Sequence, residues 1–341
     1  MEGFDRVAAQ TPEPLLDVSD LHLSVGASQE AFMPVRGASF SLAKGELLGI
    51  VGESGSGKSL TLKAIAGLLP PGVMYRKGMV RADGIEVQKA ARAELRRLHG
   101  SAIGLVFQEP LSALNPTMRI GAQIAEAARA HRSLSRAEAR QRAIGLLNRL
   151  GFTQPERRYR LFPHELSGGM RQRVVIAIAL AGEPKLLLCD EPTTALDATV
   201  TLRILELLLE LARDLGIAVV FVTHDLGVVS RICNRIVVMY GGRVVEEGST
   251  ADVLRRPRHP YTLALLRAVP TKDTTIDDLL PIPGRPPGPG DETPGCPFEP
   301  RCHYAIDRCR SPVSLKEAGL DRKSACVRAN LLDQVASGSD V

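Results

Sequence analysis

The stretch GESGSGKS at residues 52–59 constrains the fold of this chain more than any other feature. It matches the pattern G-x-x-x-x-G-K-[ST], in which glycines let the backbone turn so that successive N–H groups face phosphate oxygens. An apolar run, Leu47–Val51, precedes it, and residues 60–69 follow with the apolar spacing of a helix. Strand, glycine loop and helix in this order are the context that a phosphate-binding loop requires. The sequence therefore predicts an α/β protein that binds a nucleotide.

Individual residues of this loop have separate roles in holding a triphosphate. Lys58 brings a positive charge to the β- and γ-phosphates, and the Ser59 hydroxyl reaches Mg²⁺. The helix that begins here adds the positive end of its dipole. The predicted nucleotide-binding residues are Gly52, Glu53, Ser54, Gly55, Ser56, Gly57, Lys58, Ser59 and Leu60.

Further apolar runs predict a parallel sheet with helices on both faces. Residues 185–190 and 218–223 indicate buried strands, and an amphipathic helix over 198–215 separates them. Residues 117–181 have a helical pattern, and the strands on either side of Gly241 and Gly242 predict a β-hairpin.

Charge and hydropathy exclude several classes of protein. No apolar run approaches the roughly 18 residues of a membrane helix, and we expect no signal peptide, because the N-terminus lacks an apolar stretch. The net charge of +5 is spread along the chain, which favours a solvated surface over a nucleic-acid interface.

Asp190 and Glu191 form an acidic pair at the end of the predicted strand 185–190. A carboxylate at this place holds Mg²⁺ through water, which suits Asp190. Successive strand residues point to opposite sides, so Glu191 is placed to polarise an attacking water as a general base. Alone, the pair is equally well explained as two acids that cap a helix after a strand.

Four more segments contribute candidate residues, although each also has an ordinary structural interpretation. LSGG (166–169) opens a helix with an anion-binding N-terminus, or is simply a serine-capped helix start. Gln108 is otherwise a turn residue, Asp197 an N-cap and His224 a structural histidine. These motifs follow one another in a consistent order and spacing over about 170 residues, which argues against chance matches.

In this order the motifs resemble the ATP-binding subunits of ABC transporters, over residues 15–256. The resemblance implies a P-loop ABC ATPase cassette with a RecA-like core, an antiparallel β subdomain and a helical subdomain over about 117–181. No membrane span, second cassette or long coiled coil is expected, which excludes most exporters, translation factors and chromosome-maintenance ATPases.

By this resemblance, catalysis falls to Glu191 as the base, His224 as the residue that contacts the γ-phosphate and positions the water, and Gln108. Mg²⁺ would be held by Ser59 and Gln108, with Asp190 in support. Ser167, Gly168 and Gly169 would bind the γ-phosphate of ATP held by a second subunit, so that each site is complete only in a head-to-tail dimer.

One position departs from the family pattern. An aromatic residue usually stacks on adenine at the end of the first strand, where this chain has Val25. Phe32 from the following loop is the candidate substitute, and the stacking residue is left open.

Several short stretches of the sequence narrow the resemblance to importers of dipeptides and oligopeptides and their nickel-transporting relatives. These stretches are GESGSGKS, QEPLSALNP, ELSGGMRQRVVIAIAL, DEPTTALDATV and HPYTLALL. The implied partners are two membrane permease subunits, an external solute-binding protein and a second ATPase subunit, identical or paralogous, on the cytoplasmic face of the inner membrane. Nickel chelates, opines and oligosaccharides stay open as substrates, and a nucleic-acid-stimulated ATPase is the alternative from another class.

Residues 257–341 differ in character from the cassette. Residues 281–295 hold six prolines and four glycines and indicate a linker or wrapping arm. Four cysteines follow, separated by five, six and sixteen residues: Cys296, Cys302, Cys309 and Cys326.

Four clustered thiolates suggest tetrahedral sulfur ligation. Structural zinc sites usually have C-x₂₋₄-C pairs, which this segment lacks. The resemblance implies a [4Fe–4S] cluster as a structural staple; zinc, or no metal at all, stays open, with His303 as a stand-in ligand. We expect Cys189, in a strand, and Cys233, in a helix, to be plain core thiols.

Overall fold

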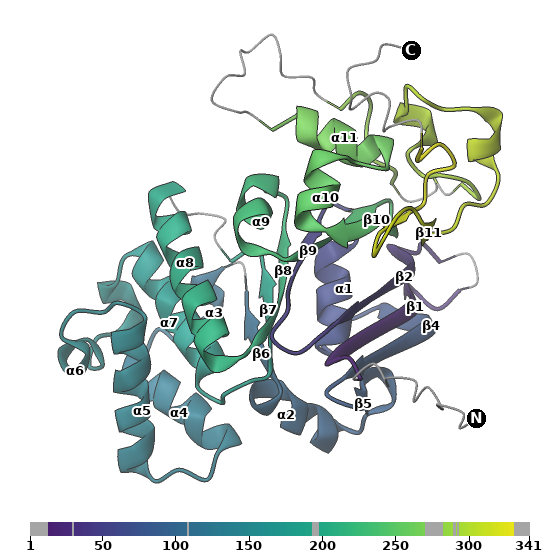
Figure 1. Ribbon diagram of the computed structural model, residues 1–341. Coiled ribbons are helices and arrows are strands. Elements are labelled where there is room, and N and C mark those ends of the chain that lie inside the picture. The colour runs from purple at the N-terminus through teal and green to yellow at the C-terminus, as the bar shows by residue number, and fades with distance from the viewer. Residues whose placement is uncertain are drawn as a thin grey trace, which may run out of the picture.

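Two β-sheets and several groups of helices make up the fold (Figure 1). The computed structural model describes residues 13–28, 31–107, 109–192, 198–269, 282–288, 291 and 293–330, and the side chains of 111 and 198–200 are not described. Among these residues, none of the helices is both long and apolar enough to cross a lipid bilayer.

The larger sheet carries the predicted phosphate loop at its centre. Its strand order is β11-β12-β10-β9-β3-β8-β7-β6, and β6, β7, β8, β3 and β9 run parallel. The parallel strands are β3 (Leu47–Val51), β6 (Ile103–Val106), β7 (Leu186–Asp190), β8 (Ala218–Thr223) and β9 (Arg235–Tyr240). The antiparallel strands are β10 (Arg243–Ser249), β11 (Lys316–Glu317) and β12 (Lys323–Ser324). The predicted strands and the hairpin β9–β10 are thus confirmed.

The smaller sheet is antiparallel, with strand order β2-β1-β4-β5. Its strands are β1 (Leu16–Val25), β2 (Val35–Leu42), β4 (Val73–Ala82) and β5 (Ile85–Glu86). It lies beside α1 (Lys58–Ile65), which follows the phosphate loop (Figure 1). The helix is shorter than the predicted 60–69, because Gly67 leaves the helical conformation at φ 66°.

A group of helices covers the face of the larger sheet that lies opposite α1, and these helices extend away from the sheet (Figure 1). The helical pattern predicted over 117–181 forms α4 (Ile120–His131), α5 (Arg136–Arg149), α6 (Pro155–Arg158) and α7 (Gly168–Leu180). The remaining helices are α2 (Arg92–Ser101), α3 (Pro110–Ala113), α8 (Ala198–Leu215), α9 (Leu226–Ile232), α10 (Thr250–Arg255) and α11 (Pro260–Arg267). Cys233 directly follows α9 instead of lying within a helix, since its ψ of 141° is extended.

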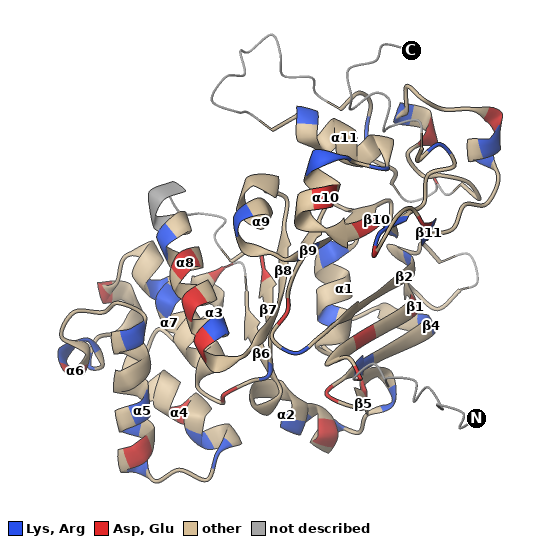
Figure 2. Ribbon diagram, in the orientation of Figure 1, with Lys and Arg blue, Asp and Glu red and all other residues tan. Residues whose placement is uncertain are grey.

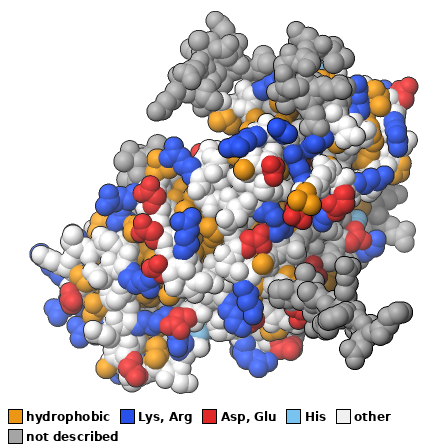
Figure 3. All heavy atoms as spheres, in the orientation of Figure 1, with side chains coloured by type: hydrophobic (Ala, Val, Ile, Leu, Met, Phe, Trp, Pro, Cys, Tyr) orange, Lys and Arg blue, Asp and Glu red, His pale blue; other side chains and the backbone are white. Residues whose placement is uncertain are grey.

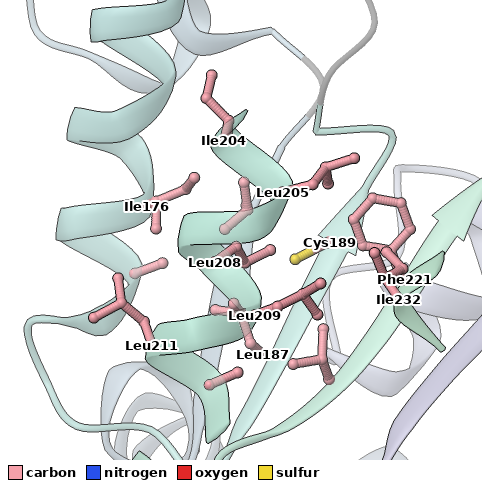
Figure 4. Close-up of a cluster of buried hydrophobic side chains, with 14 of the residues drawn as sticks. Ile176, Leu187, Cys189, Ile204, Leu205, Leu208, Leu209, Leu211, Phe221 and Ile232 are labelled. Carbon is pink, nitrogen blue, oxygen red and sulfur yellow. The ribbon is translucent and has the colours of Figure 1, made fainter. Parts of the chain in front are cut away.

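Alternating residues of the central strands separate two hydrophobic cores. Leu187 and Cys189 of β7 face α7, α8 and α9, whereas Leu186 and Leu188 belong to the core beneath α1 and the smaller sheet. Figure 4 shows Leu205, Leu208 and Leu209 of α8 directed toward Cys189, Phe221 and Ile232. Both Cys189 and Cys233 are buried, as predicted.

Residues 293–330 continue the larger sheet beyond β10. Here β12 pairs antiparallel with β10, and β11 pairs with β12 (yellow end of the chain in Figure 1). We call residues 257–330, as far as they are described, the C-terminal extension. Its short strands add to the edge of the cassette's own sheet, so the extension is attached to the cassette through backbone hydrogen bonds.

Charged side chains of both signs are interspersed. Figure 2 shows acidic and basic residues on the same helices, and Figure 3 shows them mixed over one face of the molecule. This distribution agrees with the predicted solvated surface.

Candidate nucleotide-hydrolysing site

The phosphate loop connects β3 to α1, and two of its glycines are required by their surroundings. At Gly52, φ is 153° and an added Cβ would lie 2.1 Å from the Met239 carbonyl oxygen. At Gly57, φ is 96° and a Cβ would lie 2.6 Å from the Pro34 carbonyl oxygen. Any side chain here would displace neighbouring backbone, so the motif glycines allow the loop to pass closely between other segments.

Lys58 lies inside this loop and is nearly buried. Its Nζ donates to the carbonyl oxygens of Gly52 at 2.7 Å and Glu53 at 2.8 Å. Burial lowers the pKa of Lys58, while the carboxylates of Glu191, Asp190 and Glu53 oppose that shift. The ammonium group is therefore held at the loop by its carbonyls and by three surrounding acids.

Ser59 and Asp190 meet as the sequence predicts. The Ser59 hydroxyl donates to Asp190 Oδ1 at 2.8 Å, and Asp190 is only 7% exposed. Asp190 points to the same side of β7 as Leu186 and Leu188, which is the side of α1. Burial raises the pKa of Asp190, although the Ser59 hydrogen bond and Lys63 lower it. A hydroxyl and a carboxylate side by side are oxygen donors of the kind that Mg²⁺ prefers.

Glu191 adopts an unusual backbone conformation next to this pair. Its φ is +43°, in the left-handed region that costs a non-glycine residue about 1–3 kcal/mol. Its Oε1 lies 3.2 Å from His224 Nδ1, and its N–H donates to the Val222 carbonyl oxygen at 3.0 Å. The ends of β7 and β8 thus bring together the predicted base and the predicted water-positioning histidine, with the His224 side chain 61% exposed.

Two predicted elements of the site lie outside the described residues. These are Gln108 and the segment 193–197, which contains Asp197. Their roles stay predictions.

The LSGG segment begins α7 on the opposite side of the larger sheet. Ser167 is the N-cap of this 13-residue helix and accepts a hydrogen bond from the Met170 N–H at 3.4 Å. Ser167 and Gly168 are exposed. Because α1 and α7 pack on different cores, this N-terminus does not belong to the sheet face that carries Ser59 and Asp190.

Val25 and Phe32 lie together at the end of β1. The Val25 N–H donates to the Phe32 carbonyl oxygen at 2.9 Å, and the Val25 side chain is 46% exposed. Phe32 is half-buried. Which residue contacts the nucleotide base stays a prediction.

The four C-terminal cysteines line one small cavity. Its walls also include Pro260, Phe298, Val313 and Val327, and the cysteines are Cys296, Cys302, Cys309 and Cys326. Burial raises the pKa of Cys296 to about 11 and of Cys326 to about 12. Within the described part of the chain, no group of three or more His, Cys, Asp or Glu residues is arranged to hold a metal ion.

Sequence reasoning missed His259, which adjoins this cavity. Its Nδ1 accepts from the Tyr261 N–H at 3.1 Å, so Nε2 carries the proton and lies 3.8 Å from Cys296 Sγ. Burial lowers the pKa of His259 to about 3, so the ring is neutral. The predicted stand-in, His303, is exposed. The HPYT string could have singled out His259, because a histidine before Pro at a helix start suggests an N-cap.

Comparisons with known proteins agree with this geometry. The family model described as "ABC transporter" matches residues 35–194, and the "Oligopeptide/dipeptide transporter, C-terminal region" matches residues 245–309. The chain is 43% identical to the oligopeptide transport ATP-binding protein OppD of Salmonella typhimurium, over 96% of this chain and 98% of the relative. It is 46% identical to the dipeptide transport ATP-binding protein DppD of Escherichia coli, over 92% of this chain and 96% of the relative.

Two further similarities concern length and fold. The OppD of Mycobacterium tuberculosis is 48% identical over 94% of this chain, but the chain spans about half of that relative, 52%. A dimeric bacterial ABC transporter cassette of known structure has a TM-score of 0.61 and 31% identity, covering 69% of this chain and 98% of that one.

The phosphate loop, the acidic pair and the sheet order define an ABC-type ATPase cassette, as the sequence predicted. Within that class, the chain belongs to the family of ATP-binding proteins of oligopeptide and dipeptide ABC transporters.

Proposed function

We propose that this chain hydrolyses ATP to power the import of dipeptides or oligopeptides through an ABC transporter. The observation that carries the proposal is the Ser59–Asp190 contact beside Lys58, with Glu191 and His224 adjoining it. Binding, metal and base functions are thus assembled at the carboxyl ends of neighbouring strands, where α/β folds place their ligands.

Lys58 and the N–H groups of residues 52–60 bind the triphosphate of the substrate ATP. Ser59 and Gln108 would hold Mg²⁺, with Asp190 in support, and the ion would supply positive charge against the phosphates. Glu191 orients the attacking water and takes its proton. The exposed His224 ring, close to Glu191, contacts the γ-phosphate and positions that water.

A second ATPase subunit completes each site. The exposed N-terminus of α7, at Ser167, Gly168 and Gly169, offers N–H groups and a positive helix end to the γ-phosphate bound by the partner. Its position on the other side of the sheet from Ser59 supports action in trans. The partner is either identical or paralogous, and ATP closes the dimer because it binds the closed state more tightly.

The transporter complex implied by the family supplies the remaining partners. These are two membrane permease subunits and an extracytoplasmic solute-binding protein, with the chain peripheral on the cytoplasmic face of the inner membrane. Nickel chelates, opines and oligosaccharides are the alternative cargoes. Ligand binding to the associated solute-binding protein distinguishes them, because that protein and the permease set the cargo.

The C-terminal cysteines form a proposed [4Fe–4S] site. Zinc, or no metal at all, is the alternative, and among the described residues no group of three or more His, Cys, Asp or Glu is arranged to hold a metal ion. Four cysteines around one apolar-walled cavity would supply the sulfur donors of such a group. Anaerobic preparation should yield about four iron and four sulfide per chain, and Cys302→Ser should lower both values.

Domain boundaries also stay a proposal: a cassette over 15–256, a helical subdomain over about 117–181 and an extension over 257–341.

The direct test of the proposed function is ATP hydrolysis by the complex with its permease and binding protein. Peptide-loaded binding protein should stimulate hydrolysis, whereas stimulation by DNA or RNA instead would overturn the assignment.

A further inference from the structure

One arginine of the C-terminal extension reaches the phosphate loop. Arg301 forms a two-point ion pair with Glu53, the second residue of the loop motif: Nη1 donates to Oε2 at 2.7 Å and Nη2 to Oε1 at 3.1 Å. The two residues are separated by 248 positions in the chain. Bidentate pairs of this kind fix geometry as well as charge.

Three further hydrogen bonds hold the guanidinium group of Arg301 in its orientation toward Glu53. Its Nε donates to the Pro283 carbonyl oxygen at 2.6 Å, Nη2 to the Ile282 carbonyl oxygen at 3.3 Å and Nη1 to the Tyr240 hydroxyl at 3.0 Å. With the two bonds to Glu53, all five N–H donors of the side chain are used. The Arg301 side chain is only 6% exposed, and this burial strengthens its pairing.

Aromatic rings enclose this guanidinium. Its Cζ lies 5.7 Å from the centroid of Tyr240 and 5.9 Å from that of Phe298. Tyr240 ends β9 of the cassette, whereas Phe298 belongs to the extension. The two rings meet edge to face at 5.2 Å, so the arginine lies in a site built by both parts of the chain.

The extension also holds the backbone of Glu53. The Glu53 N–H donates to the hydroxyl of Tyr261, at 2.7 Å, from α11. Tyr261 is fully buried and packs on Tyr240 at 4.4 Å between ring centroids. The same loop residue is therefore fixed by the extension at its amide and at its carboxylate.

We infer that Arg301 is a positioning residue for nucleotide binding, through which the C-terminal extension sets the shape and charge of the phosphate loop. The inference rests on the proposed ATP-binding function of that loop. Glu53 lies within electrostatic range of Lys58, and a carboxylate without Arg301 would attract that ammonium group and repel the triphosphate. Arg301 neutralises Glu53 and fixes the orientation of its carboxylate.

The position of Arg301 beside Cys302 joins this contact to the cysteine cavity. Cys302 lines that cavity, and Arg301 ends the short turn Glu299–Arg301 that precedes it. The residue that pairs with the phosphate loop is therefore bonded directly to a residue that lines the cysteine cavity.

The test measures binding of AMP-PNP with Mg²⁺ to the full chain, together with kcat and thermal unfolding. Arg301→Gln should raise the Kd about tenfold, or about 1.4 kcal/mol, while kcat at saturating ATP changes less than about twofold, because the groups at Glu191 are untouched. Arg301→Lys keeps the positive charge but cannot form the two parallel hydrogen bonds to Glu53. It should give an intermediate Kd, and it can be measured even if the glutamine variant fails to fold.

A matched control and a double variant separate positioning from general stability. Arg310→Gln makes the same charge change in the same segment, at an arginine that is 73% exposed and pairs with Glu299, and should leave the Kd unchanged. Adding Glu53→Gln to Arg301→Gln should recover part of the lost affinity, because no free carboxylate then competes for Lys58.

Three results would overturn the inference: an unchanged Kd in both Arg301 variants, no recovery of affinity when Glu53→Gln is added to Arg301→Gln, or an equal loss in Arg310→Gln. Absence of nucleotide binding by the unmodified chain would instead contradict the proposed function itself.

Discussion

The cassette and the C-terminal extension are stabilised by different means. The cassette buries two large cores of aliphatic side chains on the faces of one sheet. In residues 293–330 of the extension, the buried apolar or thiol side chains are Phe298, Cys309 and Ala325, whereas Arg301, Arg322 and Ser324 are buried polar residues. Hydrophobic packing thus shapes the cassette, whereas residues 293–330 depend on specific polar contacts with it.

Those polar contacts are directed at the cassette. Arg301 pairs with Glu53 of the phosphate loop, and Arg322 pairs with Glu246 of β10 at 2.6 Å. Each pair is a buried arginine from the extension on a cassette glutamate. Such pairs define one geometry but tolerate loss of a partner poorly, so the extension is attached in a unique orientation. The groups proposed for catalysis and the arginine proposed to position the phosphate loop thus come from regions that are stabilised in different ways.

The largest effect is expected at the catalytic base. Glu191→Gln should lower kcat by about 10²–10⁴-fold, the range for loss of general base catalysis, while ATP binding is retained. Single-turnover hydrolysis and equilibrium binding measure the two quantities. Near-normal hydrolysis would remove Glu191 as the base and with it the assignment of chemistry to the cassette.

The next effect concerns attachment of the extension. Arg322→Met should destabilise the folded chain by about 3–5 kcal/mol, because Glu246, fully buried, would lose its charged partner. Urea unfolding measures this change. The double variant with Glu246→Gln should be more stable than Arg322→Met alone; equal stability of the two would show that the pair does not hold the extension.

Removing a buried side chain from the cassette should lower the free energy of unfolding by a comparable or smaller amount. Leu208→Ala in α8 should cost about 2–5 kcal/mol, since Leu208 is 1% exposed and packs toward β7 (Figure 4). Leu320→Ala in the extension, at a side chain 93% exposed, is the control and should change stability by less than about 0.5 kcal/mol. Similar losses at both sites would contradict the assignment of cassette stability to buried aliphatic side chains.

The smallest effect tests a polar contact within the cassette. The Tyr75 hydroxyl donates to the Ala64 carbonyl oxygen at 2.6 Å, and Tyr75→Phe should cost about 1 kcal/mol at pH 7. Burial raises the pKa of Tyr75 to about 12, above its value of about 10 in the unfolded chain.

The sign of the Tyr75 pH effect follows from these values. The folded chain keeps the phenolic proton longer, so this contribution is complete below pH 10 and is lost as the pH rises toward 12. Its slope is at most about 1.4 kcal/mol per pH unit. The free energies of unfolding of the unmodified chain and of Tyr75→Phe, measured between pH 8 and 11, check this sign. The difference between the two free energies should shrink as the pH rises, and a constant difference would contradict the burial argument.

The cassette could be predicted largely from the sequence, because its signals are local. Strand, glycine loop and helix at 47–65 follow one another directly, and the residue types of the loop have a single chemical use. The contact of Ser59 with Asp190 also follows, since parallel strands place their carboxyl ends at one edge.

Contacts of the extension could not be predicted in this way. Nothing near Arg301 in the sequence indicates Glu53, because their pairing depends on where Ile282 and Pro283 of the proline-rich arm hold the guanidinium group. The same holds for Tyr261 on the Glu53 amide and for His259 at Cys296. These contacts join segments far apart in the chain, and only the folded arrangement brings them together.

One paired measurement tests whether the cassette performs hydrolysis while the extension sets nucleotide affinity. The Kd for AMP-PNP with Mg²⁺ and the kcat at saturating ATP are compared in Glu191→Gln and Arg301→Gln. We expect a crossed pattern: Glu191→Gln keeps the Kd and loses kcat, whereas Arg301→Gln raises the Kd and keeps kcat. Loss of kcat with an unchanged Kd in Arg301→Gln would contradict it.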